Sequence, residues 1–141
     1  MNKHQLLLLT LLALGFFGCD SQRRIDLEDT NWQLVKMTVL GGFEFVPDEP
    51  ERYVLNFRSD SRLQGTSDCN NLTGSWQQEE TSLSFQSFTS STNLCPPGSL
   101  HNYLVLYLRD VVGLEFREGN LILSTTTEDV ALEFESRDKP Q

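Results

Sequence analysis

Basic residues are scarce in this chain of 141 residues, because 11 Lys and Arg stand against 20 Asp and Glu, giving a formal net charge of −9. Binding to phosphate backbones needs clustered Lys and Arg, and Arg23-Arg24 is the only adjacent basic pair. The composition therefore argues against a nucleic-acid partner. An acidic surface favours solubility and little non-specific binding.

Histidine is scarcer still, since the chain contains only His4 and His101. His4 falls in a predicted leader, so a Ser-His triad would have to use His101, which has Asn102 rather than a carboxylate beside it. No glycine loop of the phosphate-binding type follows a strand, and no two acidic residues stand out as a general acid–base pair. We therefore interpret the protein as non-enzymatic and expect no cofactor and no metal.

Long apolar runs are also missing. The longest, Leu6 to Phe17, has about a dozen residues, whereas a membrane-spanning helix needs roughly 20. We predict a signal peptide over residues 1–18. Its end, Phe16-Phe17-Gly18-Cys19, resembles the bacterial lipobox, although Phe16 stands where leucine is usual.

The lipobox resemblance implies cleavage before Cys19 and acylation of that cysteine, for example with palmitate. Several acyl chains, at about 0.8 kcal/mol per buried CH2, would anchor the protein durably to a lipid membrane. The polar residues 19–29 would then be a tether, and the protein would be lipid-anchored in the bacterial cell envelope, at either the inner or the outer membrane. The alternative is ordinary secretion, with Cys19 paired to another cysteine.

Period-two alternation dominates the rest of the chain and predicts a mainly β domain over residues 30–136, followed by a tail over 137–141. In the first strand, Trp32, Leu34 and Lys36 would share one face. Further strands are predicted at 43–45, 53–58, 62–66, 73–78, 82–86, 114–117, 121–123 and 130–135.

One segment has helical periodicity, and it predicts an amphipathic helix over about residues 98–111, before the last three strands. Its buried face would comprise Leu100, Tyr103, Leu104, Tyr107, Leu108 and Val111. Ser99 would cap the helix and Gly113 would end it. A small antiparallel sheet closed towards a barrel, with the helix over an opening or edge, leaves the fewest unpaired strand edges.

These features, in this order, resemble the META (HslJ-like) domain family. Asn31 to Leu34 resembles the opening of that domain. Residues 65–74 resemble its Gly-x-x-Gly-Cys-Asn signature, which a further glycine follows. Residues 92–96 resemble its Thr-x-Met-x-Cys segment. The motif residues are Trp32, Gly65, Asp68, Cys69, Asn70, Gly74, Thr92, Cys95 and Pro96. Two departures are clear: Asp68 stands where the family has glycine, and Leu94 directly precedes Cys95.

The resemblance implies a calycin-like β-barrel with one helix, of a kind found in bacterial envelope proteins and linked to heat shock and drug tolerance. No enzyme activity is established for that family as a class, so the resemblance implies a fold and a location rather than a reaction.

Cys69 and Cys95 are the cysteines left once Cys19 is acylated, and an oxidising compartment with an even count favours a disulfide between them. Two free thiols or a redox pair are alternatives, as is a metal site formed by the two cysteines, His101 and Asp68.

For function, two hypotheses follow. The first is a membrane-anchored, non-catalytic module that acts through envelope protein partners or in stress protection. The second is a carrier or sensor that binds a small apolar ligand inside the barrel.

Overall fold

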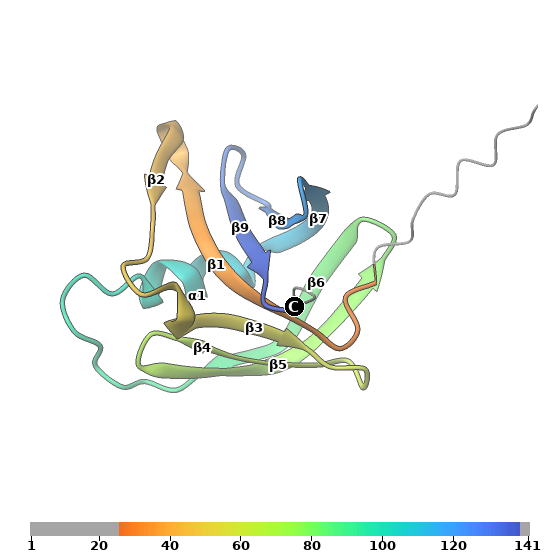
Figure 1. Cartoon of the computed structure of the whole chain (residues 1–141), viewed down its shortest axis with the longest axis horizontal. Helices are drawn as coiled ribbons and strands as arrows, with labels where there is room; N and C mark the ends of the chain where they lie inside the picture. Colours follow the sequence, from red (N-terminus) through yellow and green to blue (C-terminus); the bar gives the residue numbers. More distant parts are fainter. Residues whose placement is uncertain (1–25, 139–141) are drawn as a thin grey trace, which may run out of the picture.

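The computed structural model describes residues 26–138, and in them nine strands form one antiparallel sheet with a single α-helix (Figure 1). Cys19 and the predicted signal peptide lie outside the described residues. Two 3-10 turns, η1 (Leu40–Gly42) and η2 (Pro50–Arg52), flank the second strand. The other elements, in chain order, are β1 (Thr30–Val39), β2 (Phe43–Phe45), β3 (Tyr53–Phe57), β4 (Arg62–Ser67), β5 (Asn70–Glu79), β6 (Ser82–Ser90), α1 (His101–Arg109), β7 (Val111–Arg117), β8 (Asn120–Thr125) and β9 (Ala131–Ser136).

The sheet closes into a barrel through β1, the first strand. Its residues 30–33 pair with β3 and its residues 32–38 pair with β9. The strands other than β2 therefore form a closed ring of eight, while β2 pairs with the end of β1 and stands outside the ring (Figure 1). This architecture confirms the predicted antiparallel barrel with one helix before the last three strands.

A bulge in β1 changes which side chains point inward. The register with β9 shifts between Leu34 and Lys36. Trp32 and Leu34 are buried before the shift, and Met37 and Val39 are buried after it. The prediction that Lys36 shares the buried face was wrong, because the extra residue turns Lys36 outward and brings Met37 into the core.

Apolar side chains of the protein itself occupy the barrel interior. They come from every strand of the ring and from Leu104, Val105 and Leu108 of α1. Leu27, just before β1, is also fully buried, and its carbonyl accepts hydrogen bonds from the Thr30 N–H and hydroxyl at 3.2 and 2.6 Å. The largest side chains with less than 2% exposure are Phe57, Phe134, Leu27, Leu34, Met37, Leu55, Leu63, Leu72, Leu83, Leu104, Leu108 and Leu121.

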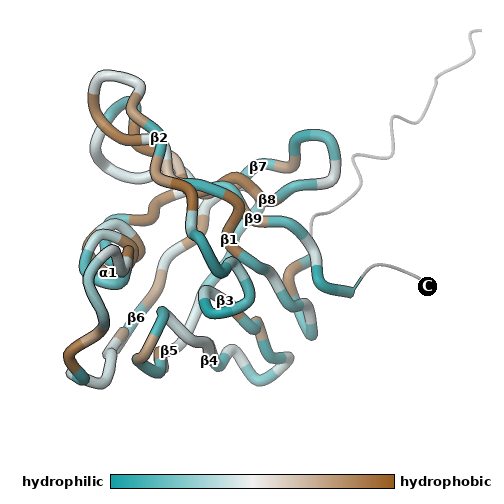
Figure 2. The backbone as a smooth tube through the Cα atoms, turned by 60° about the vertical axis from the view of Figure 1, so that its left-hand side comes forward, coloured by the Kyte–Doolittle hydropathy of each residue, from teal (hydrophilic) through white to brown (hydrophobic). Residues whose placement is uncertain are grey.

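The ring is weakest between β6 and β7. These strands share one residue pair, Ser82 with Gly113, supplemented by the Leu114 N–H donating to the Thr81 carbonyl at 2.8 Å. The connection between them carries α1, whose buried side chains pack into the core beside this seam (Figures 1 and 2). The helix thus completes a wall that strand pairing leaves nearly open.

The helix is shorter than predicted, from His101 to Arg109. Gly113 does not end it, because Gly113 lies in β7 at the seam, where a Cβ atom would come within 2.7 Å of the Ser124 Oγ. Ser99 lies before the helix, and its hydroxyl accepts a hydrogen bond from the His101 N–H at 3.2 Å. Among the residues that the structure describes, no helix is long and apolar enough to cross a membrane.

Candidate functional site

The tight turn between β4 and β5 contains Asp68 and Cys69, and it explains one departure from the META pattern. Asp68 has a φ of 56°, in the left-handed region where glycine is favoured and aspartate is among the better-tolerated alternatives. The Arg52 guanidinium holds the Asp68 carboxylate at 2.8 Å, and the Asp68 N–H donates to the Arg52 carbonyl at 2.9 Å. The position calls for glycine because of its backbone, and aspartate is held there by a partner.

Cys69 and Cys95 form a disulfide, with Cα atoms 5.4 Å apart. This confirms the predicted pair over free thiols and removes both sulfurs from any metal site. The bond joins the β4–β5 turn to the long connection between β6 and α1. We call this bond, together with Asn70, Ser91 and Asn93, the disulfide clamp.

Asn70 makes the clamp specific, because its buried amide, 1% exposed, binds the opposite segment through both of its polar atoms. Its oxygen accepts hydrogen bonds from the Ser91 hydroxyl at 2.9 Å and the Asn93 N–H at 2.7 Å. Its nitrogen donates to the Asn93 carbonyl at 3.1 Å, and the Asn93 amide donates back to the Cys69 carbonyl at 3.0 Å. The network needs no ligand to satisfy it.

The start of α1 is fixed to the same end of the barrel. The His101 Nδ1 lies 2.9 Å from the hydroxyl of Ser67, which is fully buried, and the Leu100 N–H donates to the Tyr53 hydroxyl at 3.0 Å. His101 is therefore a link between helix and barrel. Within residues 26–138, no group of three or more His, Cys, Asp or Glu side chains could hold a metal ion.

The remaining motif residues also have structural surroundings. A Cβ atom on Gly65 would lie 2.1 Å from the Val54 carbonyl oxygen, so only glycine allows β3 and β4 to approach as they do. Trp32 is buried, and its indole N–H donates to the Thr30 hydroxyl at 2.7 Å. Gly74 lies at the register shift between β5 and β6, Thr92 is exposed, and the Pro96 carbonyl accepts the Ser99 N–H at 3.2 Å.

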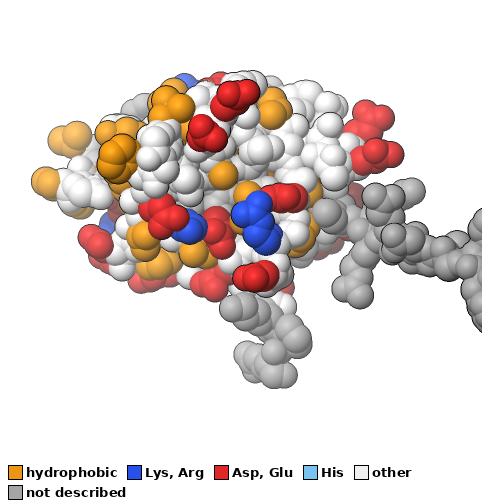
Figure 3. Space-filling view, turned by 90° about the horizontal axis from the view of Figure 1, so that it is seen from above, with side chains coloured by type: hydrophobic (Ala, Val, Ile, Leu, Met, Phe, Trp, Pro, Cys, Tyr) orange, Lys and Arg blue, Asp and Glu red, His pale blue; other side chains and the backbone are white. Residues whose placement is uncertain are grey.

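The most conspicuous surface is apolar, and the sequence reasoning missed it. Phe43 is 70% exposed, and Phe45 stacks on Tyr103 of α1 with ring centroids 5.2 Å apart, joining the β1–β2 hairpin to the helix. Figure 3 shows apolar side chains gathered on the left part of the upper face, where Figure 1 places this hairpin. We call this surface the apolar ledge; it comprises Leu40, Phe43, Phe45, Val46, Tyr103 and Leu106.

The predicted helical face placed Tyr103 in the core, and this was wrong, because Tyr103 is 47% exposed. Leu106, 53% exposed, lies one turn further along on the same side of the helix. One signal was available in the sequence: Leu106 lies outside the predicted buried face, so an apolar residue was left facing away from the core.

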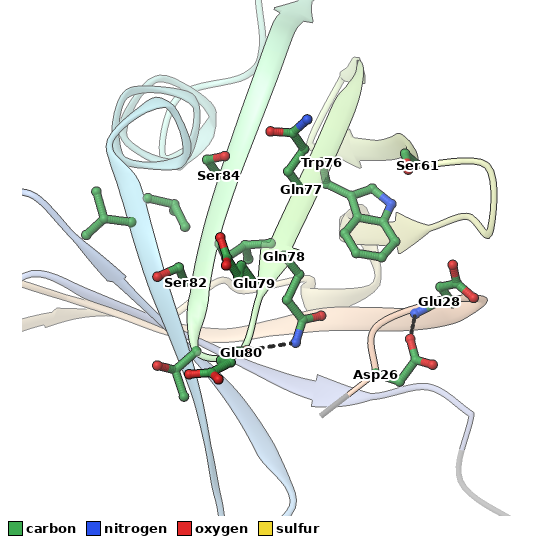
Figure 4. Close-up of a pocket in the computed structure, with 14 residues that line it drawn as sticks. Asp26, Glu28, Ser61, Trp76, Gln77, Gln78, Glu79, Glu80, Ser82 and Ser84 are labelled. Atoms are coloured by element: carbon green, nitrogen blue, oxygen red, sulfur yellow. Dashed lines mark hydrogen bonds between the residues drawn. The ribbon is translucent and has the colours of Figure 1, made fainter. Parts of the chain in front are cut away.

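A second surface feature is an open hollow around the tip of the β5–β6 hairpin (Figure 4). Its charged side chains are all acidic: Asp26, Glu28, Glu79 and Glu80. The Glu28 N–H donates to the Asp26 carboxylate at 2.9 Å, and the Gln78 amide donates to the Glu80 carbonyl at 3.0 Å. No histidine, cysteine, lysine or arginine is among the described residues that line it.

Comparison with known proteins identifies the domain. A family model described as META domain matches residues 25–138. Among solved structures, an NMR structure of a protein from Burkholderia xenovorans is similar, with 22% identity, a TM-score of 0.67, and coverage of 80% of this chain and 85% of that one. A crystal structure of a duf4847 family protein from Bacteroides vulgatus ATCC 8482 is also similar, with 14% identity, a TM-score of 0.56, and coverage of 82% and 96%. At these identities the likeness shows the fold alone. No curated protein matches the chain.

Proposed function

This chain belongs to the META domain family, and from that premise we propose that it is a lipid-anchored envelope protein whose META domain is a non-catalytic interaction or stress-protection module. The observation that carries the proposal is the apolar ledge. Large exposed apolar surfaces on a folded domain are typical of protein–protein contact sites.

The other parts of the molecule support a binding role over a chemical one. The motif residues around the turn at Asp68 hold the barrel together through the disulfide clamp, and no histidine, cysteine or lysine is among the described residues that line the hollow at the hairpin tip. The interior is occupied by large apolar side chains of the protein itself, which argues against the carrier hypothesis. The ledge leaves Leu40, Phe43, Val46 and Leu106 more than half exposed to solvent.

The membrane anchor is proposed from the lipobox resemblance at Cys19, and it has its own test. We expect the wild-type chain to incorporate radiolabelled palmitate and to sediment with membranes, and Cys19→Ser to lose both properties. Cys95→Ser is the matched control, because it removes a cysteine from the domain and leaves the lipobox intact. A Cys19→Ser protein that still carries the label and sediments with membranes would refute the anchor.

The interaction role is tested by site-specific photocrosslinking in living cells. A photoreactive amino acid at Leu106, in the ledge, is expected to give discrete crosslinked bands. The same group at Leu94, which is fully exposed but lies in the β6–α1 connection, is the control and is expected to give none. Equal crosslinking from both positions, or none from either position, would count against an interaction role for the ledge.

A further inference from the structure

The β2 strand has a free edge. It is the end strand of the sheet order within the described residues, paired to β1 through Val39 with Phe43, Thr38 with Glu44 and Met37 with Phe45. In Figure 2 the hairpin that carries it projects away from the barrel, above α1. An unpaired strand edge presents backbone donors and acceptors to which another extended chain can add.

The two faces of β2 differ in chemistry. Side chains alternate along a strand, so Phe43 and Phe45 share the face that meets Tyr103, and Glu44 points to the other face. There the Lys36 amine lies 2.6 Å from Glu44, and this hydrogen bond raises the pKa of Lys36 above its ordinary value. One face of β2 is therefore apolar, and the other face carries a carboxylate.

On the face of β2 that carries Glu44, carboxylates outnumber amines. Lys36 serves both Glu44 and Glu133, the latter at 3.9 Å, so two carboxylates share one amine. A chain lying along β2 would meet the Glu44 carboxylate on that face.

We propose that the β2 edge binds an extended segment of a partner protein in which apolar and basic residues alternate. The segment would add as a strand beside β2. Its apolar side chains would lie on Phe43, Phe45 and Tyr103, and its Lys or Arg side chains would lie beside Glu44. This inference deepens the proposed interaction role and rests on it.

A second copy of the chain fits the edge poorly. Two β2 strands pairing antiparallel about Glu44 would place that carboxylate opposite its own counterpart, and like charges directly opposite each other destabilise a sheet. Both copies would also carry the formal net charge of −9. The apolar and basic pattern must therefore come from a different protein.

A membrane surface fits poorly as well. The described chain begins at Asp26, beside the tip of the β5–β6 hairpin, and in Figure 1 this lies on the other side of the molecule from the β1–β2 hairpin. Acidic side chains beside the ledge would be repelled by anionic lipid headgroups.

The test uses the full-length chain in detergent micelles and three synthetic peptides. One alternates valine and lysine, one has the same composition with the two residue types in separate blocks, and one alternates valine and glutamate. Backbone amide NMR shifts locate the binding, and titration gives the affinity. We expect the valine–lysine peptide to shift the amides of Phe43, Glu44 and Phe45, and to bind about tenfold or more tightly than either of the other two.

Two variants and one control sharpen this result. Phe43→Ser is expected to weaken binding about tenfold, as for a hot-spot side chain, and Glu44→Lys to switch the preference to the valine–glutamate peptide. Leu94→Ser, exposed and outside the ledge, should bind as wild type does.

The proposal is overturned if the block peptide binds equally well, if no peptide shifts the β2 amides, or if both variants bind as wild type. It is also overturned if the free protein self-associates through an interface that Phe43→Ser abolishes. These outcomes are separable from failure of the proposed function, which is tested by acylation at Cys19 and by crosslinking at Leu106.

Discussion

In the disulfide clamp, polar side chains hydrogen-bond one another around the buried amide of Asn70, whereas in the apolar ledge large apolar side chains face solvent. Asn70 is 1% exposed and binds both Ser91 and Asn93. Phe43 is 70% exposed and stands on a hairpin outside the closed ring. Both regions contact the same connection, because the clamp holds the chain just before α1 and the ledge includes the outer face of α1 itself.

The difference separates the residues that identify the family from those that offer a surface. The clamp contains three of the nine motif residues, Cys69, Asn70 and Cys95, and its side chains are engaged in holding the barrel. The ledge carries none of the motif residues, and apart from the Phe45–Tyr103 stack its side chains are mostly exposed. If this contrast is correct, changes in the clamp should alter stability, and changes in the ledge should alter binding with little effect on stability.

The largest expected effect is the loss of the disulfide. In the double variant Cys69→Ser, Cys95→Ser, we expect the free energy of unfolding to fall by about 3–4 kcal/mol, because the bond closes a loop of the unfolded chain. Chemical denaturation without reductant measures this. Leu94→Ser, beside Cys95, is the control and should leave stability unchanged. If the double variant were as stable as wild type, the clamp would not stabilise the fold.

Removal of the Asn70 amide should have the next largest effect. Asn70→Ala leaves the Asn93 N–H and carbonyl and the Ser91 hydroxyl without their partner, and we expect a loss of about 2–3 kcal/mol. Asn71→Ala is the matched control, since Asn71 is the adjacent residue but is exposed. Thermal unfolding followed by circular dichroism compares the two; similar melting temperatures for both variants would contradict a structural role for Asn70.

A smaller effect is expected at Asp68, through its left-handed backbone. Asp68→Gly should be more stable than Asp68→Val by about 1–2 kcal/mol, because a β-branched side chain is strained at a φ of 56°. Asp129 has a φ of 63°, so the same pair of substitutions there should give a similar difference if the backbone conformation is its cause. Urea denaturation of the four variants gives both differences. Equal stability of the valine and glycine variants at both positions would show that the backbone conformation is not limiting.

The smallest effect on stability is expected in the ledge. Phe43→Ser and Leu106→Ser should each change the free energy of unfolding by less than about 0.5 kcal/mol, because both side chains are already exposed in the folded state. Leu104→Ala, in the buried face of the same helix, should cost about 2–5 kcal/mol and serves as the contrast. A large loss from either ledge variant would mean that the ledge belongs to the core.

Much of the fold could be predicted from the sequence, because most strands alternate cleanly. Val130, Leu132 and Phe134 point inward and Glu133 and Glu135 are only partly buried, as period two predicts. The disulfide was predicted from the even number of cysteines left after Cys19, together with the predicted oxidising compartment. These predictions depended on local patterns that tertiary structure did not override.

The errors arose where geometry depends on residues distant in sequence. The bulge that turned Lys36 outward depends on the register with β9. Gly113 looked like a helix stop, but its small size serves the contact between β7 and its neighbours. The ledge could not be predicted from helical periodicity. Periodicity shows which residues lie on one side of the helix, but tertiary packing decides how many of them are buried. Tyr103 lies on the predicted buried side and is nevertheless exposed.

The pairing of β1 with β9 also imposes an order in time. β1 is the first strand of the ring to be synthesised and β9 is the last, so one edge of β1 lacks its partner until residues 131–136 arrive. At about 5–20 residues per second, the roughly 90 residues between the two strands take about 5–20 s to make. Through that interval the closed barrel cannot form, because one edge of β1 is still unpaired.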